Sequence, residues 1–189
     1  YNALFIADEV QTGVARTGKR LAVDHENVKP DILVLGKALS GGVYPVSAVL
    51  ADDRIMHVIK AGQHGSTFGG NPLAAAVAIE ALQVVKDERL AENAARLGEI
   101  FRKEISNYIK TSKIATLVRG KGLLNAVVIN DTEESDTAWN ICLKMRDNGL
   151  LAKPTHGNII RFAPPLVMNE TELRECIAII INALKTFEK

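Results

Sequence analysis

Apolar residues occur in short runs through the first part of the chain. Three such runs lie at residues 3–7, 31–35 and 46–51, bounded by polar residues, glycine or proline. Short continuous apolar runs with these boundaries are typical of strands buried on both faces of an α/β sheet. We therefore expect three interior strands.

The pattern changes after Asn71-Pro72. Residues 73–82 are rich in alanine and contain no helix breaker, which predicts a long helix with proline near its first turn. Because its positions are mostly apolar, we expect this helix to be mostly buried. A second helix, at residues 90–110, carries more charge and should have one face in water.

The remaining residues alternate between strand and helix patterns. Asn169 can cap the final helix, because Glu172, three residues on, can bond back to the cap. An apolar stripe follows in that helix, formed by Leu173, Ile177, Ile180, Leu184 and Phe187. Before it, the sequence predicts a turn at 118–122, a strand at 123–129, a helix at 137–146 and strands at 150–153 and 159–162.

These elements predict an α/β protein in two parts. Residues 1–90 should form part of an α/β domain, and residues 91–189 a small α+β domain. We place the boundary near residue 90, within helix. The chain opens at Tyr1 directly into an apolar strand, without a methionine or charged leader, so we expect a piece of a longer chain.

Composition narrows the class of partner. The 189 residues are 47% hydrophobic and 24% charged, with 23 lysines and arginines against 22 acids. This balance argues against nucleic acid or an anionic membrane surface as partner, and no apolar run approaches the roughly 20 residues of a membrane span. Cys142 and Cys176 lie in predicted helices, and we interpret both as packing residues.

Two candidate chemical groups stand at the ends of predicted strands, where ligands collect in open α/β sheets. Asp8 closes an apolar strand, where an acid is costly unless a cation or strong donor meets it; a cap for the following turn is the alternative. Lys37 stands between a strand and a glycine-rich turn. A desolvated lysine can form a Schiff base with an aldehyde, whereas a lysine extending into solvent needs no such role.

A third candidate is the loop at residues 62–72, GQHGSTFGGNP. Its small residues, the hydroxyls of Ser66 and Thr67 and its position before a helix suit phosphate binding, although a tight structural turn explains it equally well. His64 and His156 lie in glycine-containing turns, yet neither has a second ligand at metal spacing, and we expect no metal.

Together, ADEVQTG, RTGK and GSTFGGNP stand in the order and spacing of one family. Over essentially its whole length the chain resembles the fold-type I, class III aminotransferases. The resemblance implies pyridoxal 5'-phosphate as cofactor. It also makes residues 1–90 the C-terminal part of the large cofactor-binding domain, with a mixed, mostly parallel sheet and helices on both faces. Two further strings, GKALSGGVYPVSAVL and GLLAKPTHGNIIRFAPPL, are similar to the members that act on ornithine.

The resemblance also implies roles for matched residues. Asp8 pairs with the pyridinium nitrogen, and Gln11 hydrogen-bonds the cofactor's phenolic oxygen. Lys37 is the Schiff-base lysine and, once displaced, moves the proton between substrate and cofactor. Thr67, together with Ser66, reaches across a dimer interface to the phosphate of the partner's cofactor, so a homodimer with shared active sites is expected.

Arg161 lies between apolar neighbours on a predicted strand. A guanidinium there requires a carboxylate, and the resemblance makes it the clamp for the α-carboxylate of the amino acceptor. A structural ion pair within the small domain is the alternative.

The implied reaction moves the δ-amino group of ornithine to 2-oxoglutarate, giving glutamate 5-semialdehyde, which cyclises to pyrroline-5-carboxylate, and glutamate. Members of the family that act on acetylornithine or 4-aminobutyrate are the nearest alternatives, because the residues that select the donor lie largely upstream of the segment matched by Tyr1. A non-catalytic fragment is another, and we expect the isolated 189 residues to be inactive. The expected compartment is the mitochondrial matrix in an animal and the cytoplasm otherwise.

Overall fold

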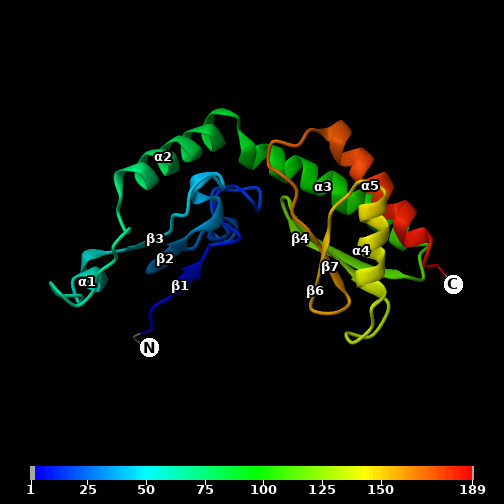
Figure 1. Cartoon of the computed structure of the whole chain (residues 1–189), viewed down its shortest axis with the longest axis horizontal. Coiled ribbons are helices and arrows are strands. Elements are labelled where there is room, and N and C mark those ends of the chain that lie inside the picture. Colours follow the sequence, from blue (N-terminus) through cyan, green and yellow to red (C-terminus); the bar gives the residue numbers. More distant parts are fainter. Residues whose placement is uncertain (1–2, 189) are drawn as a thin grey trace. The chain divides into compact units, whose positions relative to one another are not determined.

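The computed structural model describes residues 3–188. The chain divides into two compact units, Tyr1–Ala91 and Glu92–Lys189 (Figure 1). The division falls in the first turn of α3 (Leu90–Ile109), the helix that continues from one unit into the other. The sequence predicts a boundary near residue 90, within helix.

A sheet of short strands forms the centre of the first unit. β1 (Ile6–Asp8) pairs in parallel with β2 (Ile32–Leu35), which pairs antiparallel with β3 (Ala48–Ala51). Each strand overlaps a segment predicted as a strand. The prediction that they are interior strands is wrong, since the side chain of Ile6 is 57% exposed. The physical reason is that, among residues 3–188, β1 and β3 each have a neighbouring strand on one side and no element buries the face on which Ile6 lies.

Helical segments connect and follow these strands. They are η1 (Ala22–His25), η2 (Lys37–Ser40), α1 (Asp53–Met56) and α2 (Pro72–Asp87). α2 begins with proline as predicted, and Asn71 Oδ1 caps it by accepting a hydrogen bond of 2.8 Å from the Ala74 N–H.

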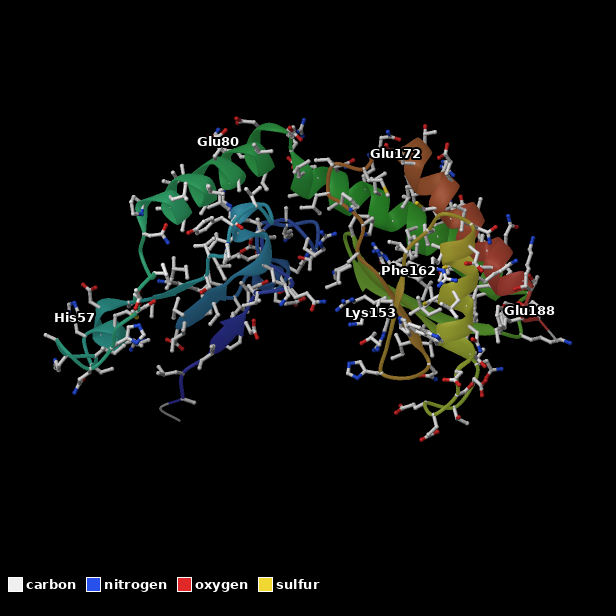
Figure 2. All side chains as sticks on the ribbon, viewed as in Figure 1. His57, Glu80, Lys153, Phe162, Glu172 and Glu188 are labelled. Atoms are coloured by element: carbon white, nitrogen blue, oxygen red, sulfur yellow. The ribbon has the colours of Figure 1, made fainter. Side chains whose placement is uncertain are left out.

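The prediction that α2 is mostly buried is wrong. Ala74 is its one buried residue, and Ile79 is 69% exposed. α2 packs against η2, and Glu80 points away from the sheet of this unit (Figure 2). The short η2 covers only a narrow strip of a 16-residue helix, so most apolar side chains of α2 have no covering element among residues 3–188.

An antiparallel sheet forms one layer of the second unit. Its order is β4-β5-β7-β6, from β4 (Ala115–Lys121), β5 (Leu124–Ile129), β7 (Ile159–Phe162) and β6 (Lys153–Thr155). The strands predicted at 123–129 and 159–162 are confirmed.

Two sequence predictions in this sheet are wrong. The turn expected at 118–122 is strand instead, because Gly120 stays in the ladder opposite Asn125 and the chain reverses only at Gly122 and Leu123. The strand expected at 150–153 begins at Lys153 and contains Pro154. β6 is an edge strand, where a proline costs no ladder hydrogen bond.

The helices of the second unit supply most of its core. α3 is amphipathic as predicted, with Leu97 and Ile105 fully buried, and it is joined by α4 (Thr137–Asp147) and α5 (Glu170–Lys185). The predicted stripe of α5 is buried from Leu173 to Leu184, whereas Phe187 lies half-buried beyond the end of the helix. Figure 2 shows Glu172 and Glu188 at opposite ends of α5.

The capping box predicted for α5 is confirmed. Asn169 Oδ1 accepts a hydrogen bond of 3.0 Å from the Glu172 N–H, and Glu172 Oε2 accepts one of 2.9 Å from the Asn169 N–H. Both backbone donors would otherwise be unpaired at the helix start.

Both cysteines are free, in agreement with the packing interpretation. Cys142 is buried in α4, and burial raises the pKa of its thiol to about 11. Cys176 is half-buried in α5. None of the helices within residues 3–188 combines the length and apolar character that crossing a membrane requires.

Candidate active site

Asp8 and Lys37 emerge at the same edge of the first unit's sheet. In the parallel pair of β1 and β2, Asp8 lies opposite Val34, and the Glu9 N–H donates to the Val34 carbonyl at 3.0 Å. Lys37 follows the end of β2 after one residue, Gly36. The carboxyl ends of neighbouring parallel strands meet at one edge, which is where ligands bind in α/β sheets.

The Asp8 carboxylate is exposed and partly held by the backbone. Its Oδ1 accepts a hydrogen bond of 3.1 Å from the Val10 N–H, so the turn-capping role considered from the sequence is present. Within residues 3–188, Oδ2 accepts no hydrogen bond. One oxygen therefore fixes the group in place while the other can receive a proton-bearing partner.

Lys37 has an unusual backbone conformation for a side chain of its size. Its φ of +45° lies in the left-handed region, which costs on the order of 1 kcal/mol for a residue other than glycine. Such strain persists where the surrounding chain imposes it, and it occurs often at functional sites. Here Lys37 opens η2, which ends at Gly41 with φ +63°.

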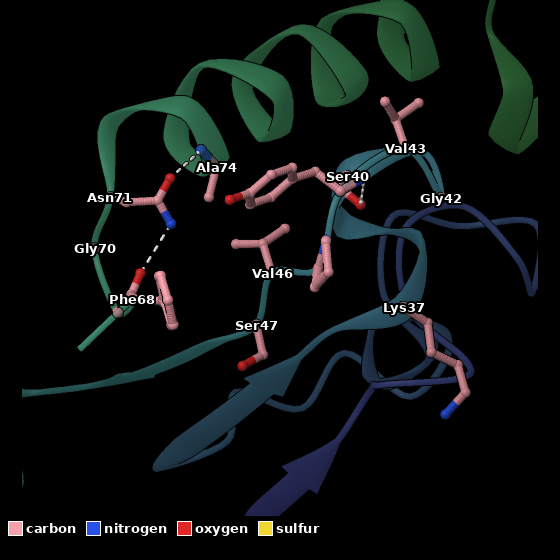
Figure 3. Close-up of a pocket in the computed structure, with 13 residues that line it drawn as sticks. Lys37, Ser40, Gly42, Val43, Val46, Ser47, Phe68, Gly70, Asn71 and Ala74 are labelled. Atoms are coloured by element: carbon pink, nitrogen blue, oxygen red, sulfur yellow. Dashed lines mark hydrogen bonds between the residues drawn. The ribbon is translucent and has the colours of Figure 1, made fainter. Parts of the chain in front are cut away.

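The Lys37 side chain is exposed, so of the two alternatives that the sequence leaves open, a desolvated lysine and a lysine extending into solvent, the described residues show the second. Its amine makes no ion pair or hydrogen bond with the part of the chain that the structure describes. The reason is that β2, the strand before it, is itself only half-buried. In Figure 3 the side chain extends away from Ser47 and Phe68.

Glu9 is a structurally important residue of this edge that the sequence reasoning missed. It is only 2% exposed, and its Oε1 accepts a hydrogen bond of 2.9 Å from the Val23 N–H, while Thr12 Oγ1 donates to Oε2. These bonds hold residues 10–23 against the end of β1. The available signal was two acids in succession at a strand end, because adjacent side chains there point to opposite sides. Gln11 is exposed in the turn at the start of this segment.

The loop with Ser66 and Thr67 is exposed and organised by its own hydrogen bonds. Ser66 Oγ accepts a bond of 2.9 Å from the Gly69 N–H. Asn71 Nδ2 donates to the Phe68 carbonyl at 2.8 Å, as Figure 3 shows. The Thr67 hydroxyl is exposed just before the start of α2. In the described chain, no hydrogen bond joins Ser66 or Thr67 to Asp8 or Lys37.

An open pocket of about 820 Å³ lies between this loop and the segment from η2 to β3. Its polar wall includes Ser40, Tyr44, Ser47 and Asn71. Lys37 contributes to the rim, but its amine points away (Figure 3). The pocket therefore borders the Asp8–Lys37 edge without containing the lysine nitrogen.

Arg161 belongs to the second unit. It lies on β7 between the buried residues Ile160 and Phe162, as the sequence predicts, and is itself half-buried. It lines a cavity of about 220 Å³ whose walls are mostly apolar and include Pro164 and Pro165. No group of three or more potential metal ligands occurs within residues 3–188.

Comparisons with known proteins place the chain in a family. The family described as aminotransferase class-III matches residues 1–184. The chain is 63% identical over 187 residues to the mitochondrial ornithine aminotransferase of Rattus norvegicus, covering 99% of the chain and 42% of that protein. It is 60% identical over 185 residues to ornithine aminotransferase car2 of Schizosaccharomyces pombe, covering 97% of the chain and 42% of that protein. The chain thus spans less than half the length of these curated relatives.

Solved structures of aminotransferases are also similar to the chain. An acetylornithine aminotransferase from Elizabethkingia anophelis is 66% identical with a TM-score of 0.95, covering 98% of this chain and 46% of that one. An ornithine aminotransferase from Plasmodium yoelii is 54% identical with a TM-score of 0.94, covering 100% and 49%. A family match over residues 1–184, with relatives more than half identical along nearly the whole sequence, shows that the chain belongs to the class III aminotransferases.

Proposed function

We propose that the chain is part of a pyridoxal-phosphate-dependent aminotransferase that transfers the δ-amino group of ornithine to 2-oxoglutarate. The products are glutamate 5-semialdehyde, which cyclises to pyrroline-5-carboxylate, and glutamate. The observation that carries the proposal is that ornithine aminotransferases of several organisms are 55–63% identical to the chain over 97–100% of its length. For an animal protein, the mitochondrial names of such relatives favour the mitochondrial matrix.

The residues at the sheet edge fit the cofactor. Pyridoxal phosphate, when bound, supplies an aldehyde and a ring that withdraws electrons from the substrate. Asp8 has a free carboxylate oxygen on a strand end, and it would hold a proton on the pyridine nitrogen through a charge-assisted hydrogen bond. Gln11, in the following turn, would donate its amide N–H to the phenolic oxygen.

Lys37 would bond covalently to the cofactor's aldehyde through its Nζ. The amine has no competing partner among residues 3–188, and the side chain extends away from Ser47 and Phe68 of the pocket (Figure 3). Once an amino substrate replaces it, the freed amine would carry the proton between the substrate carbon and the cofactor. The same nitrogen therefore serves two steps.

The exposed loop at Ser66 and Thr67 would bind the phosphate of a partner's cofactor. The Ser66 oxygen already accepts a bond from Gly69, so its hydroxyl proton and that of Thr67 are the groups left to donate. The family match over residues 1–184 is the basis for proposing that this loop acts across the interface of a homodimer with shared active sites.

Arg161 would bind the α-carboxylate of the amino acceptor. The planar guanidinium can form two parallel hydrogen bonds to a carboxylate, and the apolar wall of its cavity would strengthen them by excluding water. The acceptor side of the reaction therefore depends on the second unit.

A second candidate donor is acetylornithine. The solved structure of that name from Elizabethkingia anophelis is slightly more identical to the chain than the rat ornithine aminotransferase is. The two donors differ at the far end of the substrate, where acetylation removes the charge of one amine. Donor specificity is therefore the part of the proposal to test first.

The test is an absorbance spectrum of the full-length protein loaded with pyridoxal phosphate, as wild type and as Lys37→Ala. We expect a visible band that requires Lys37 and is bleached by ornithine. Lys86→Ala, at an exposed lysine of α2, is the control and should keep the band. Bleaching by acetylornithine or 4-aminobutyrate but not ornithine would overturn the donor, and a band that survives in Lys37→Ala would overturn the role of the lysine.

A further inference from the structure

Asn93 is hydrogen-bonded to the connection between β7 and α5. It lies in the first turns of α3, and its Nδ2 donates hydrogen bonds to the carbonyl oxygens of Leu166 at 2.8 Å and Met168 at 2.9 Å. These partners are 73 and 75 residues further along the chain. The Asn93 side-chain amide therefore donates both of its hydrogen bonds to the backbone of the segment that follows the strand of Arg161.

An ionic cluster fixes the far end of the same connection. Arg96, one turn after Asn93, donates to Asn93 Oδ1 at 3.2 Å and pairs with Glu170 Oε2 at 2.7 Å. Glu170 opens α5, and its other oxygen accepts a bond of 2.8 Å from Arg174. The connection is therefore tied to α3 both in its middle, by Asn93, and at its end.

The connection is stiff between Arg161 and Leu166, the first residue that Asn93 binds. β7 ends at Phe162, directly after Arg161, and the chain continues as Ala163-Pro164-Pro165-Leu166. Each proline fixes its own φ and restricts the residue before it. A displacement at Leu166 is consequently passed back towards the end of β7. Pro164, Pro165 and Met168 also line the cavity that Arg161 lines.

We infer that Asn93 is a positioning residue for Arg161: it holds the connection after β7 so that the guanidinium is presented to the acceptor's carboxylate. The inference rests on the proposed function of Arg161. A small displacement of a clamping residue weakens substrate binding and orientation far more than it weakens the fold. Asn93 therefore controls the acceptor half of the reaction and leaves the donor half alone.

The experiment replaces Asn93 in the full-length protein loaded with pyridoxal phosphate. Asn93→Asp keeps the shape but removes both N–H donors, and Asn93→Ala removes the side chain. Asn107→Asp is the matched control, because Asn107 is exposed on the same helix and only accepts a hydrogen bond from Lys110. The half-reactions with ornithine and with glutamate are followed separately by absorbance, and hydrogen exchange is measured over residues 166–169.

We expect both Asn93 variants to raise the KM for glutamate and for 2-oxoglutarate by about tenfold or more. The half-reaction with ornithine should be unchanged, exchange over residues 166–169 should be faster, and Asn107→Asp should match wild type. Faster exchange with unaltered glutamate kinetics, or equal losses with both substrates, would overturn the inference. A wild type that reacts with glutamate but not with ornithine would refute the proposed donor. The inference about Asn93 would then still be tested by comparing the glutamate kinetics of wild type and the Asn93 variants. Reaction with neither substrate would overturn both.

Discussion

Glu9 Oε1 accepts a hydrogen bond of 2.9 Å from the backbone N–H of Val23, and this bond ties the segment after β1 back to the strand that ends in Asp8. Glu9 is buried, and Thr12 donates to its second oxygen. Both donors would lose their acceptor if the carboxylate were removed. The candidate active-site edge thus depends on an acid that faces away from it.

Glu9→Ala should therefore lower the free energy of unfolding by about 2 kcal/mol, the cost of leaving two partly buried donors without their acceptor. Urea-induced unfolding followed by circular dichroism measures it. Glu26→Ala is the control, because Glu26 is exposed and only its backbone is hydrogen-bonded nearby. Equal stability of the two variants would show that Glu9 does not hold this segment.

Gly98 lies where α3 approaches the turn between β4 and β5. A Cβ built on Gly98 would lie 1.8 Å from the Gly122 carbonyl oxygen and 2.4 Å from its carbon. Such an overlap involves backbone on both sides, so no side-chain rotation relieves it.

Gly98→Ala should destabilise the protein by roughly 3 kcal/mol or more, because overpacking against backbone outweighs the ~1 kcal/mol that alanine gains in helix propensity. Thermal unfolding gives the comparison. Gly65→Ala introduces the same methyl group where nothing lies within 4 Å, and it should be nearly neutral. A stabilised Gly98→Ala would mean that helix propensity, and not the close approach, decides at this position.

Local patterns were sufficient for much of the second unit. The capping box of Asn169 and Glu172 involves residues three apart, and the stripe from Leu173 to Leu184 repeats with the helix period, so both are readable from the sequence. Burial of α2 was predicted incorrectly because an apolar segment does not specify which element covers it. Ile79 and Ile6 are apolar yet exposed for that reason.

In the candidate site, too, local features could be predicted from the sequence and long-range contacts could not. Asp8 and Lys37 were predicted as candidates because a chemically active side chain at a strand end is a local feature, and their roles stay predictions from the resemblance to class III aminotransferases. Asn93 was not, because its partners are separated from it by more than seventy residues. Long-range hydrogen bonds of a single amide leave no periodic pattern in the sequence.

Asn169→Ala tests the start of α5. The variant loses the acceptor for the Glu172 N–H, and it should lower the stability by about 1 kcal/mol. Differential scanning calorimetry of wild type and variant measures the change. Asn182→Ala, at an exposed position within the same helix, should be neutral or slightly stabilising, since alanine is the better helix former. The cap would have no energetic role if both substitutions had the same effect.

Glu188 anchors the segment after α5 to the end of α3. Tyr108 Oη donates to Glu188 Oε1 at 2.6 Å, Ser112 Oγ donates to the same oxygen at 2.5 Å, and the Lys113 N–H donates to Oε2 at 2.8 Å. Partial burial alone would raise the pKa of the Glu188 carboxyl, but these hydrogen bonds outweigh it and lower that pKa below its ordinary value. Burial, together with the bond to Glu188, raises the pKa of Tyr108 to about 12.

A folded-state pKa below the unfolded one means that ionised Glu188 stabilises the fold at pH values above the unfolded pKa of about 4.3. That contribution is lost as the pH falls through the lower, folded value, because the carboxyl is then protonated in both states. Glu188→Gln should therefore be less stable than wild type at neutral pH, by about 1 kcal/mol, and should lose less stability on acidification. Urea unfolding from neutral to acidic pH measures both slopes, with Glu175→Gln on the exposed face of α5 as the control. Parallel pH profiles for wild type and Glu188→Gln would assign the acid sensitivity to other carboxylates.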